Sequence, residues 1–245
     1  MNRGTSLPGP PVLKVSGDMG ILIEFGAIYD PVINNAVTAF DAALNADLPL
    51  GVIETVPSFR SVLVRFDPGV LAFERLHGLL ADLAASRDWY RAPPAASRRV
   101  WNLPVVYGGE HGPDLAEVGD LMGLGADAVA EAHAGAVLRV AMLGFSPGLA
   151  YLGQLPEAWD FPRRTTIAPR VPAGAILVAV RQTVLPGTDI PTGWHWIGQT
   201  PFRSFDVNAA QPFRLTPGDE VRFHAIDAAG FARFDNAAFL KGQGL

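Results

Sequence analysis

The chain has 245 residues, of which 49% are hydrophobic and 18% are charged, and its formal net charge is -5 at neutral pH. This composition supports a buried core in one large or two modest domains and excludes a wholly disordered chain. No basic run and no cysteine is present, which argues against nucleic-acid binding, a disulfide framework and a cysteine-ligated zinc. We expect a cytoplasmic protein, because no apolar stretch reaches about 18 residues and no signal peptide is evident at the N-terminus.

Residues 1–90 predict a small α+β domain. Short apolar runs predict four strands, at residues 11–15, 21–25, 51–56 and 61–66. Asp30-Pro31 predicts the start of an amphipathic helix, and Asp67-Pro68 repeats this capping signal before a second helix with leucines at helical spacing. The order indicates an antiparallel sheet that is covered by two helices.

Residues 91–99 are rich in proline and small polar side chains, and they predict a linker to a second domain over residues 100–245. In that domain helices are expected at 113–122 and 126–134. Strands are expected at 100–107, 137–143, 175–180, 194–197 and 221–223. Short strands joined by Gly- and Pro-containing loops are typical of a closed barrel or a sandwich. Residues 146–173 show little periodicity, and a loop of that length is commonly functional or disordered.

The segment from Gly144 to Gly148 matches the G-x-S-x-G pattern of a nucleophile elbow. The elbow needs a backbone N–H on the residue after the serine, and that residue here is Pro147, which has none. We therefore reject a serine hydrolase. Two interpretations remain open with equal weight: a glycine-flanked loop that lets backbone approach a ligand, and a plain turn after a strand.

Three arginines, Arg163, Arg164 and Arg170, lie in a proline-rich segment. The guanidinium fork suits carboxylate or phosphate, so the three together could form an anion site, although composition alone favours a solvated loop with surface ion pairs. Gln182-Thr183 follows an apolar run. It could place two hydrogen-bonding side chains at a cavity mouth, or it could be a polar strand end.

Alternation in a strand would put Trp194 and Trp196 on one face and His195 on the other. His133 lies at a predicted helix end, where a capping role is more common than a catalytic one. The histidines lack metal-ligand spacing, so we infer no metal site. No catalytic residue is assigned, because spacing does not choose among the candidate bases Glu157, Asp189 and Asp206.

Ordered motifs along nearly the whole chain resemble those of the KipI-like family, also called allophanate hydrolase subunit 1 or the B-type subunit of the bacterial ATP-dependent 5-oxoprolinase. The motifs are Pro104-Val105-Val106-Tyr107-Gly108-Gly109, Leu143-Gly144-Phe145, Pro162-Arg163-Arg164, Val171-Pro172-Ala173-Gly174, Gln182-Thr183, Gly193-Trp194 and Thr200-Pro201. Their number and order identify the chain as a member of that family.

The resemblance implies an α+β N-terminal domain followed by a mainly-β, cyclophilin-like barrel. It also implies a KipA-like partner subunit, with the composite site between the two, and in one branch an A-type (LamB/YcsF-like) subunit. That branch opens 5-oxoproline to glutamate and consumes ATP at the level of the complex. Two alternatives stay open: the carboxyltransferase component of a biotin-dependent urea or amide carboxylase, and a non-catalytic inhibitor of a sensor histidine kinase.

The resemblance also assigns roles to residues. An anion clamp and substrate-orienting groups would come from Arg163, Arg164, Arg170, Gln182, Thr183 and Thr200. The pocket would be lined by Gly144, Phe145, Pro147, Gly148, Tyr151 and Trp194. The chain departs from the family pattern where Leu177, Val180 and Val184 replace glycines and where Pro186 replaces a tyrosine. Larger side chains would fill the pocket, which leaves open a changed substrate or a lost activity.

Overall fold

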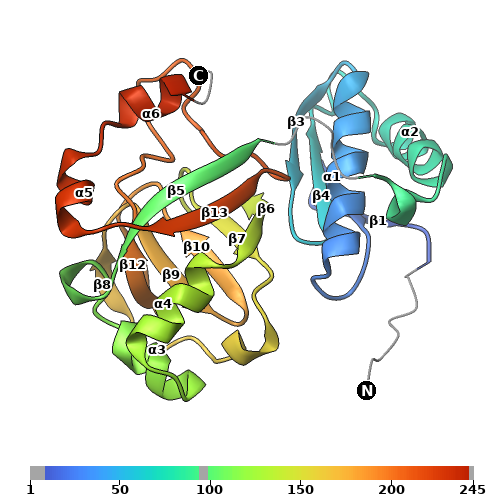
Figure 1. Ribbon diagram of the computed structural model, residues 1–245. Helices are drawn as coiled ribbons and strands as arrows, with labels where there is room; N and C mark the ends of the chain where they lie inside the picture. The colour runs from blue at the N-terminus through green and yellow to red at the C-terminus, as the bar shows by residue number, and fades with distance from the viewer. Residues whose placement is uncertain (1–8, 94–98, 243–245) are drawn as a thin grey trace. The chain divides into compact units, whose positions relative to one another are not determined.

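The computed structural model describes residues 9–93 and 99–242. The chain divides into two compact units, residues 1–97 and 98–245, which we call the sheet unit and the barrel unit. Figure 1 shows both along the colour gradient of the chain. The predicted linker falls mainly on residues 94–98, which lie outside the described residues.

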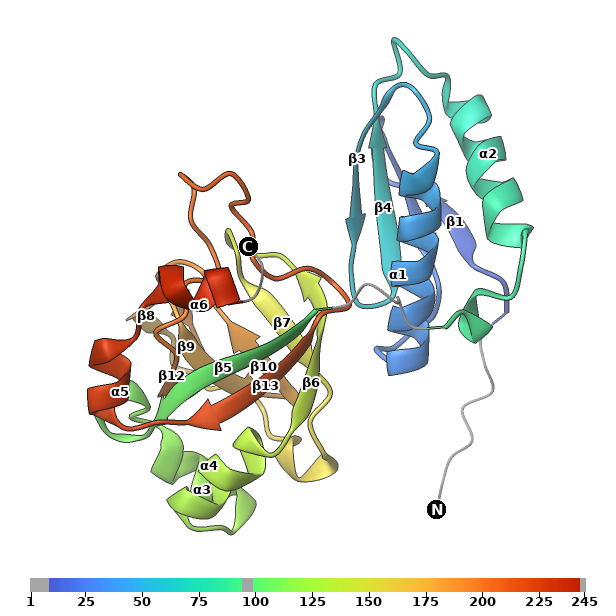
Figure 2. The same ribbon diagram turned by 45° about the horizontal axis from the view of Figure 1, so that its top comes forward.

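The sheet unit follows the predicted order of two strands, a helix, two strands and a helix. Its elements are β1 Val12–Val15, β2 Gly20–Glu24, α1 Pro31–Ala46, β3 Val52–Pro57, β4 Ser61–Phe66, α2 Phe73–Ala85 and the short 3₁₀ turn η1 Trp89–Arg91. The four strands pair antiparallel in the order β1-β2-β4-β3. The two helices are seen beside this sheet in Figure 2.

Helix α1 begins as predicted, because the Asp30 side chain accepts a hydrogen bond from the Val32 amide at 2.7 Å and proline occupies the first turn. The matching prediction for Asp67 is wrong. Its carboxylate accepts from the Gly69 amide at 2.8 Å and so closes a local turn. Helix α2 starts six residues later, with no side-chain cap on its first turn. A short Asx turn therefore uses the same residues that would otherwise cap a helix.

One core fills the space between the sheet and both helices. It contains Ile23 of β2, Val64 of β4, Phe40 of α1 and Leu80 of α2, all fully buried. Alternate residues of the two central strands, β2 and β4, supply this face, as a half-covered antiparallel sheet requires. Each such side chain stabilises the unit by about 1.5–3 kcal/mol relative to exposure.

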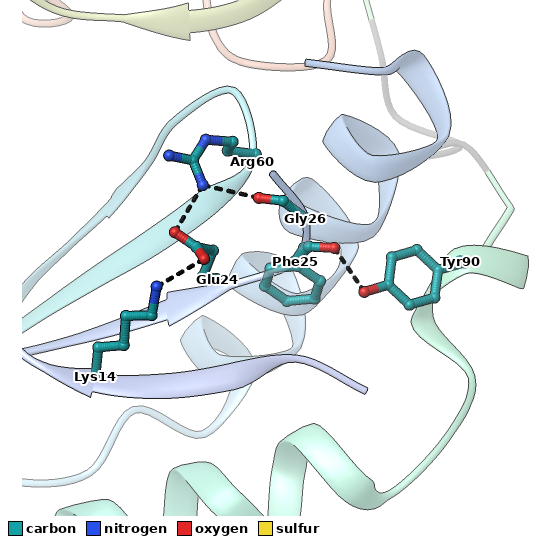
Figure 3. A network of polar contacts seen from close by, with 6 residues as sticks. All are labelled: Lys14, Glu24, Phe25, Gly26, Arg60 and Tyr90. Atoms are coloured by element: carbon teal, nitrogen blue, oxygen red, sulfur yellow. Dashed lines mark hydrogen bonds and ion pairs between the residues drawn. The ribbon is translucent and has the colours of Figure 1, made fainter. Parts of the chain in front are cut away.

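Figure 3 shows the polar network at the end of the β1–β2 hairpin. Glu24 pairs with Lys14 at 2.8 Å and with Arg60 at 2.6 Å, and the pKa of its carboxyl is lowered by these two hydrogen bonds, Lys14 first. The Tyr90 hydroxyl donates to the Phe25 carbonyl at 2.7 Å. These contacts tie η1 and the β3–β4 turn to the end of β2.

The barrel unit is built around a closed barrel of seven strands in the order β10-β7-β6-β13-β5-β12-β9. These strands are β5 Val100–Tyr107, β6 Val137–Leu143, β7 Ala150–Gly153, β9 Ala175–Ala179, β10 Gln182–Leu185, β12 His195–Gln199 and β13 Glu220–Ala225. Strands β5 and β13 pair in parallel and lie side by side in both ribbon views, while the other ladders are antiparallel. Closure leaves no free barrel edge.

Helices and short turns surround the barrel, and two further strands form a ribbon. The helices are α3 Leu115–Met122, α4 Ala126–Ala134, α5 Ala228–Arg233 and α6 Asn236–Gly242, with 3₁₀ turns η2 Gly109–His111 and η3 Glu157–Trp159. The ribbon pairs β8 Ala168–Val171 with β11 Ile190–Thr192.

Residues 146–173 are not the structureless loop that their weak periodicity suggested. They contain β7, η3 and β8, and β7 is paired on both sides, with β6 and with β10. Strand β9 also ends at Ala179 instead of Val180. These strands have four or five residues, which is too short for alternation to distinguish them from loop.

The two faces of β9 pack into different clusters. Ile176 and Val178 belong to the barrel interior, whereas Ala175 and Leu177 face outward against the β8–β11 ribbon. The barrel wall therefore has a second apolar layer on its outside, and that layer positions the cavity described next.

Candidate functional site

A cavity of about 250 Å³ lies between the outer barrel wall and the β8–β11 ribbon. Its walls are mostly apolar and include Leu149, Tyr151, Val184, Ile190 and Trp194, with Phe145 and Ile167 beside them. The charged member of the lining is Arg163. A concave apolar surface with one convergent charge is the usual form of a small-molecule site.

Arg163 is exposed and makes no ion pair with the carboxylates of the described residues. Its guanidinium carbon lies 5.8 Å from the centroid of the Trp194 ring, within the range of a cation–π contact. Burial raises the pKa of the Tyr151 phenol, and the Arg163 charge opposes this rise. The cavity thus offers an unneutralised guanidinium next to two aromatic rings.

The other two predicted arginines are held by carboxylates. Arg164 pairs with Asp114 at 2.9 Å and also with Glu117. Arg170 pairs with Asp189 at 2.6 Å, and the pKa of Asp189 is lowered first by a backbone hydrogen bond from Ala173 and then by Arg170. The structure therefore does not bring the three arginines together around one cavity.

The predicted pocket-lining residues divide into two groups. Phe145, Tyr151 and Trp194 line the cavity, whereas Gly144, Pro147 and Gly148 are not part of its lining. Gly148 has a φ of +70°, and a Cβ there would lie 2.3 Å from the Cβ of Phe205. That glycine thus permits close packing within the protein.

Gln182, Thr183 and Thr200 also lie away from the Arg163 cavity. Gln182 starts β10 and is half-buried, and Thr183 points into the barrel. The buried Thr200 hydroxyl accepts from the Phe202 amide at 3.2 Å, and Thr200 lines a separate cavity of about 400 Å³.

His133 does not cap its helix with its side chain, so that prediction is wrong. The ring is fully buried, with Nδ1 2.8 Å from the Tyr107 hydroxyl and Nε2 2.9 Å from the Thr183 hydroxyl. It stacks on Phe223 at 5.0 Å between ring centroids. Burial lowers the pKa of His133 to about 3, so the imidazole is neutral and joins α4 to the barrel interior.

The four positions that depart from the family pattern also separate. Val184 lines the cavity and Leu177 packs in the cluster behind it. Val180, in contrast, lies in the two-residue turn between β9 and β10 with a φ of +44°. Pro186 lines the Thr200 cavity, and its carbonyl accepts from the Gly174 amide. Only the first two can reduce the space of the Arg163 cavity.

Trp194 precedes β12 instead of lying in it. Trp194 and Trp196 both pack against the outer cluster, while His195 is buried at 3% exposure. Several further lining residues, among them Ile167, Ile190 and Thr192, are not predicted from the sequence. They belong to the ribbon and its approach, whose pairing has no local sequence signal.

Within residues 9–93 and 99–242 no group of three or more His, Asp or Glu side chains is arranged to hold a metal ion. The helices of this part of the chain include none that is long and apolar enough to cross a membrane.

Comparison with known proteins gives a consistent result. Residues 11–215 match the family model described as carboxyltransferase domain, subdomain C and D. The chain is 32% identical over 224 residues to the B-type subunit of 5-oxoprolinase from Bacillus subtilis, covering 86% of this chain and 90% of the relative. It is 37% identical over 180 residues to the corresponding 5-oxoprolinase subunit of Escherichia coli O157:H7, covering 72% and 79%.

Solved structures extend the comparison. TTHA0988 is 33% identical with a TM-score of 0.73, and the match covers 85% of this chain but 40% of that chain. The conserved protein PH0987 of Pyrococcus horikoshii is 35% identical with a TM-score of 0.53, covering 90% of this chain and 100% of that one. Urea amidolyase of K. lactis matches 100% of this chain and 18% of its own length with a TM-score of 0.72 at 16% identity, which shows a shared fold.

Proposed function

The chain belongs to the carboxyltransferase domain, subdomain C and D, family, and from this premise we propose that it is the B-type subunit of a multi-subunit, ATP-dependent 5-oxoprolinase. Relatives at 32% and 37% identity are named as this subunit of 5-oxoprolinase. The observation that carries the proposal is the apolar cavity with Arg163 at its wall, an arginine that forms no ion pair within residues 9–93 and 99–242.

5-Oxoproline is a small lactam ring with one carboxylate. A guanidinium binds a carboxylate through two parallel hydrogen bonds, and flat apolar walls suit the ring. Arg163 would take the carboxylate while Tyr151 and Trp194 contact the ring. This orientation would direct the amide bond away from Arg163.

An amide is a poor electrophile, so its opening needs activation. Transfer of the γ-phosphoryl group of ATP to the amide oxygen releases ADP and makes phosphate the leaving group. Water then adds to the activated carbon and the C–N bond breaks, which leaves the ring-opened chain as an acyl phosphate. A second water hydrolyses this acyl phosphate and releases glutamate and phosphate. The lining of the Arg163 cavity contains no carboxylate or imidazole that could act as the base for this attack. We therefore assign the base to another subunit.

The 144–149 loop gives little support for a nucleotide site on this chain. The Gly144 and Leu149 amides are used in hydrogen bonds within the loop, and Pro147 has no amide hydrogen. A phosphate cradle needs several free amides or cations. We propose that ATP is used by the complex and that its phosphates are bound outside this loop.

The rim of the cavity supports a partner subunit. Phe145 is 75% exposed and Ile167 is 65% exposed, and both border the opening. Adjacent exposed apolar side chains commonly mark a protein interface. We propose that a KipA-like subunit covers this rim and that an A-type (LamB/YcsF-like) subunit completes the enzyme. On this proposal the single chain has no turnover.

Two parts of the architecture belong to the same proposal. The barrel would be of the cyclophilin-like type, and the two units would correspond to an N-terminal domain over 1–90 and a barrel domain over 100–245. Expression of residues 99–245 alone, followed by a cooperative unfolding transition, would test the second part.

Reconstitution tests the function. The chain is co-expressed with the KipA-like and A-type subunits of its own genome, and ATP hydrolysis by the purified complex is measured with and without 5-oxoproline. Arg163→Ala should lower kcat/KM for 5-oxoproline by about 10- to 100-fold, because it removes a charge-assisted hydrogen bond of about 1.5–3 kcal/mol. The matched control, Arg170→Ala, removes the same charge from a surface ion pair and should change kcat/KM less than about twofold.

An intact complex without 5-oxoproline stimulation would refute the proposal. Carboxylation of urea or an amide by a complex that includes a biotin carboxylase would instead support the carboxyltransferase alternative. Inhibition of a sensor histidine kinase by the chain alone would support the non-catalytic alternative. Equal kcat/KM values for Arg163→Ala and Arg170→Ala would retain the hydrolase but refute the role of Arg163.

A further inference from the structure

A second cavity, of about 410 Å³, lies beside the first and shares Arg163 with it. Its walls come from α3 through Glu117, from residues 162–166 and from His195 of β12. The backbone that carries Arg163 is therefore a wall between two cavities, and whatever holds this backbone sets the position of the guanidinium.

The ring of His195 contacts both this backbone segment and α3. Its Nε2 lies 3.1 Å from the Pro162 carbonyl oxygen, and its Nδ1 lies 3.5 Å from Oε1 of Glu117. The side chain is 4% exposed, and its buried Nδ1 has no hydrogen-bond partner among the described residues. Phe161 covers one edge of the ring at 5.3 Å between centroids.

The two deeply buried histidines have opposite surroundings. Both nitrogens of His133 face hydroxyls, which can either donate or accept, so a neutral ring is fully satisfied. Both nitrogens of His195 face oxygens that only accept when Glu117 is ionised. In a neutral ring that donates from Nε2 to Pro162, the Nδ1 lone pair would face the carboxylate and repel it.

We propose that His195 is a positioning residue that works in its protonated form. The imidazolium donates from Nε2 to the Pro162 carbonyl and forms an ion pair through Nδ1 with the Glu117 carboxylate, and so helps to fasten the segment that carries Arg163 to α3. Loss of the proton removes the ion pair between His195 and Glu117, and with it the His195 link between Pro162 and α3, while the ion pairs of Arg164 with Asp114 and Glu117 remain. The importance of the Arg163 position for substrate binding rests on the function proposed above, whereas the protonation of His195 does not.

The neighbouring charges form an alternating row. Arg164 lies between Asp114 and Glu117, and Glu117 in turn faces His195. Asp114 also accepts from the Trp196 amide at 2.8 Å, which fixes this carboxylate on β12. Strand β9 presents Val178 opposite His195, which adds no charge. Two carboxylates, Asp114 and Glu117, share the single Arg164 guanidinium, so the cluster keeps one net negative charge that the imidazolium can balance.

Nitrogen-15 NMR of the full chain, labelled at histidine, tests the protonation. The His195 signals are assigned by their loss in His195→Gln. At pH 6.5 the ratio of protonated to neutral His195 should be about tenfold lower in Glu117→Gln than in the wild type, which corresponds to about 1.4 kcal/mol. The matched control is Asp120→Asn, on the exposed surface of the same helix, which should leave the ratio within about twofold. An unchanged ratio in Glu117→Gln overturns the proposal.

Fluorine NMR of the chain labelled with 5-fluorotryptophan tests the positioning. The Trp194 signal is assigned by its loss in Trp194→Phe. Because Arg163 lies against Trp194, the chemical shift of this signal should change with pH in proportion to the fraction of His195 that is protonated. In His195→Gln, whose amide donates at every pH, this dependence should be lost, while buried Trp101 serves as an internal reference in both proteins. A Trp194 chemical shift that does not change as His195 is protonated in the wild type overturns the positioning role.

Discussion

Acidification should destabilise the barrel unit through His133. The pKa of this buried imidazole is about 3 in the folded chain, against about 6.5 in an unfolded one. Between these two values the unfolded state binds one proton more, so stability falls as the pH falls. From pH 7.5 to pH 5.0 the loss due to His133 is about 2 kcal/mol, because each pH unit well below 6.5 costs about 1.4 kcal/mol.

The variant His133→Gln isolates this contribution. Glutamine keeps a donor and an acceptor for Tyr107 and Thr183 but does not titrate. It should cost about 1–3 kcal/mol at pH 7.5 through lost stacking on Phe223 and imperfect hydrogen bonds. The fall in stability between pH 7.5 and pH 5.0 should then be smaller by about 2 kcal/mol than in the wild type.

Urea unfolding at the two pH values, followed by tryptophan fluorescence, measures the effect. Of the 5 tryptophans only Trp89 belongs to the sheet unit, so Trp89→Phe makes the signal specific for the barrel unit. His224→Gln is the matched control, because that ring is exposed and its Nε2 lies 3.1 Å from the Asn102 side-chain oxygen at the barrel surface. The reasoning is refuted if wild type and His133→Gln lose the same free energy of unfolding on acidification.

Three substitutions test the backbone and the sheet unit by urea unfolding, with Trp89 replaced by Phe for the two barrel substitutions and kept as the reporter of the sheet unit for Tyr90→Phe. Val180→Gly should stabilise the barrel unit by about 1 kcal/mol, because a β-branched residue is strained at a φ of +44°, and a lower stability would contradict this. Gly112→Ala should cost at least about 2 kcal/mol, since the new Cβ would lie 2.2 Å from the Ile197 carbonyl oxygen. An unchanged midpoint would show that the backbone can yield there. Tyr90→Phe should cost the sheet unit about 1 kcal/mol, because the Phe25 carbonyl loses its 2.7 Å hydrogen bond, and a neutral result would mean that water replaces the hydroxyl.

The elements that the sequence predicts correctly are those whose capping, periodicity or length can be recognised from their own residues. Helix α1 has its cap and proline at the start and apolar residues at helical spacing, and β5 is a run of eight residues. Strands β7, β8, β10 and β11 have three or four residues each, and their identity comes from partners elsewhere in the chain. Strand β10, for example, exists because β7 and β9 flank it. No local pattern records such pairing.

The same limit decides how much of the site could be predicted. Phe145, Tyr151, Arg163 and Trp194 line one cavity, and their role in binding stays a prediction. The resemblance could not separate Arg163 from its neighbours, because the difference lies in distant carboxylates. Glu117, which pairs with Arg164, is 47 positions away, and Asp189, which pairs with Arg170, is 19 positions away.

Neutralisation by these carboxylates changes what each arginine can do. A guanidinium that already forms an ion pair with a carboxylate binds a second anion weakly. The second anion either has to displace the carboxylate or is repelled by its negative charge. Arg164 and Arg170 therefore serve to fasten α3 and the ribbon, while Arg163, which pairs with no carboxylate in the described part of the chain, keeps its full charge for a ligand. The Arg163→Ala and Arg170→Ala pair compares two arginines of the same segment that differ in this respect. A large loss of kcat/KM in the first alone would trace the specificity of the site to the placement of acidic partners.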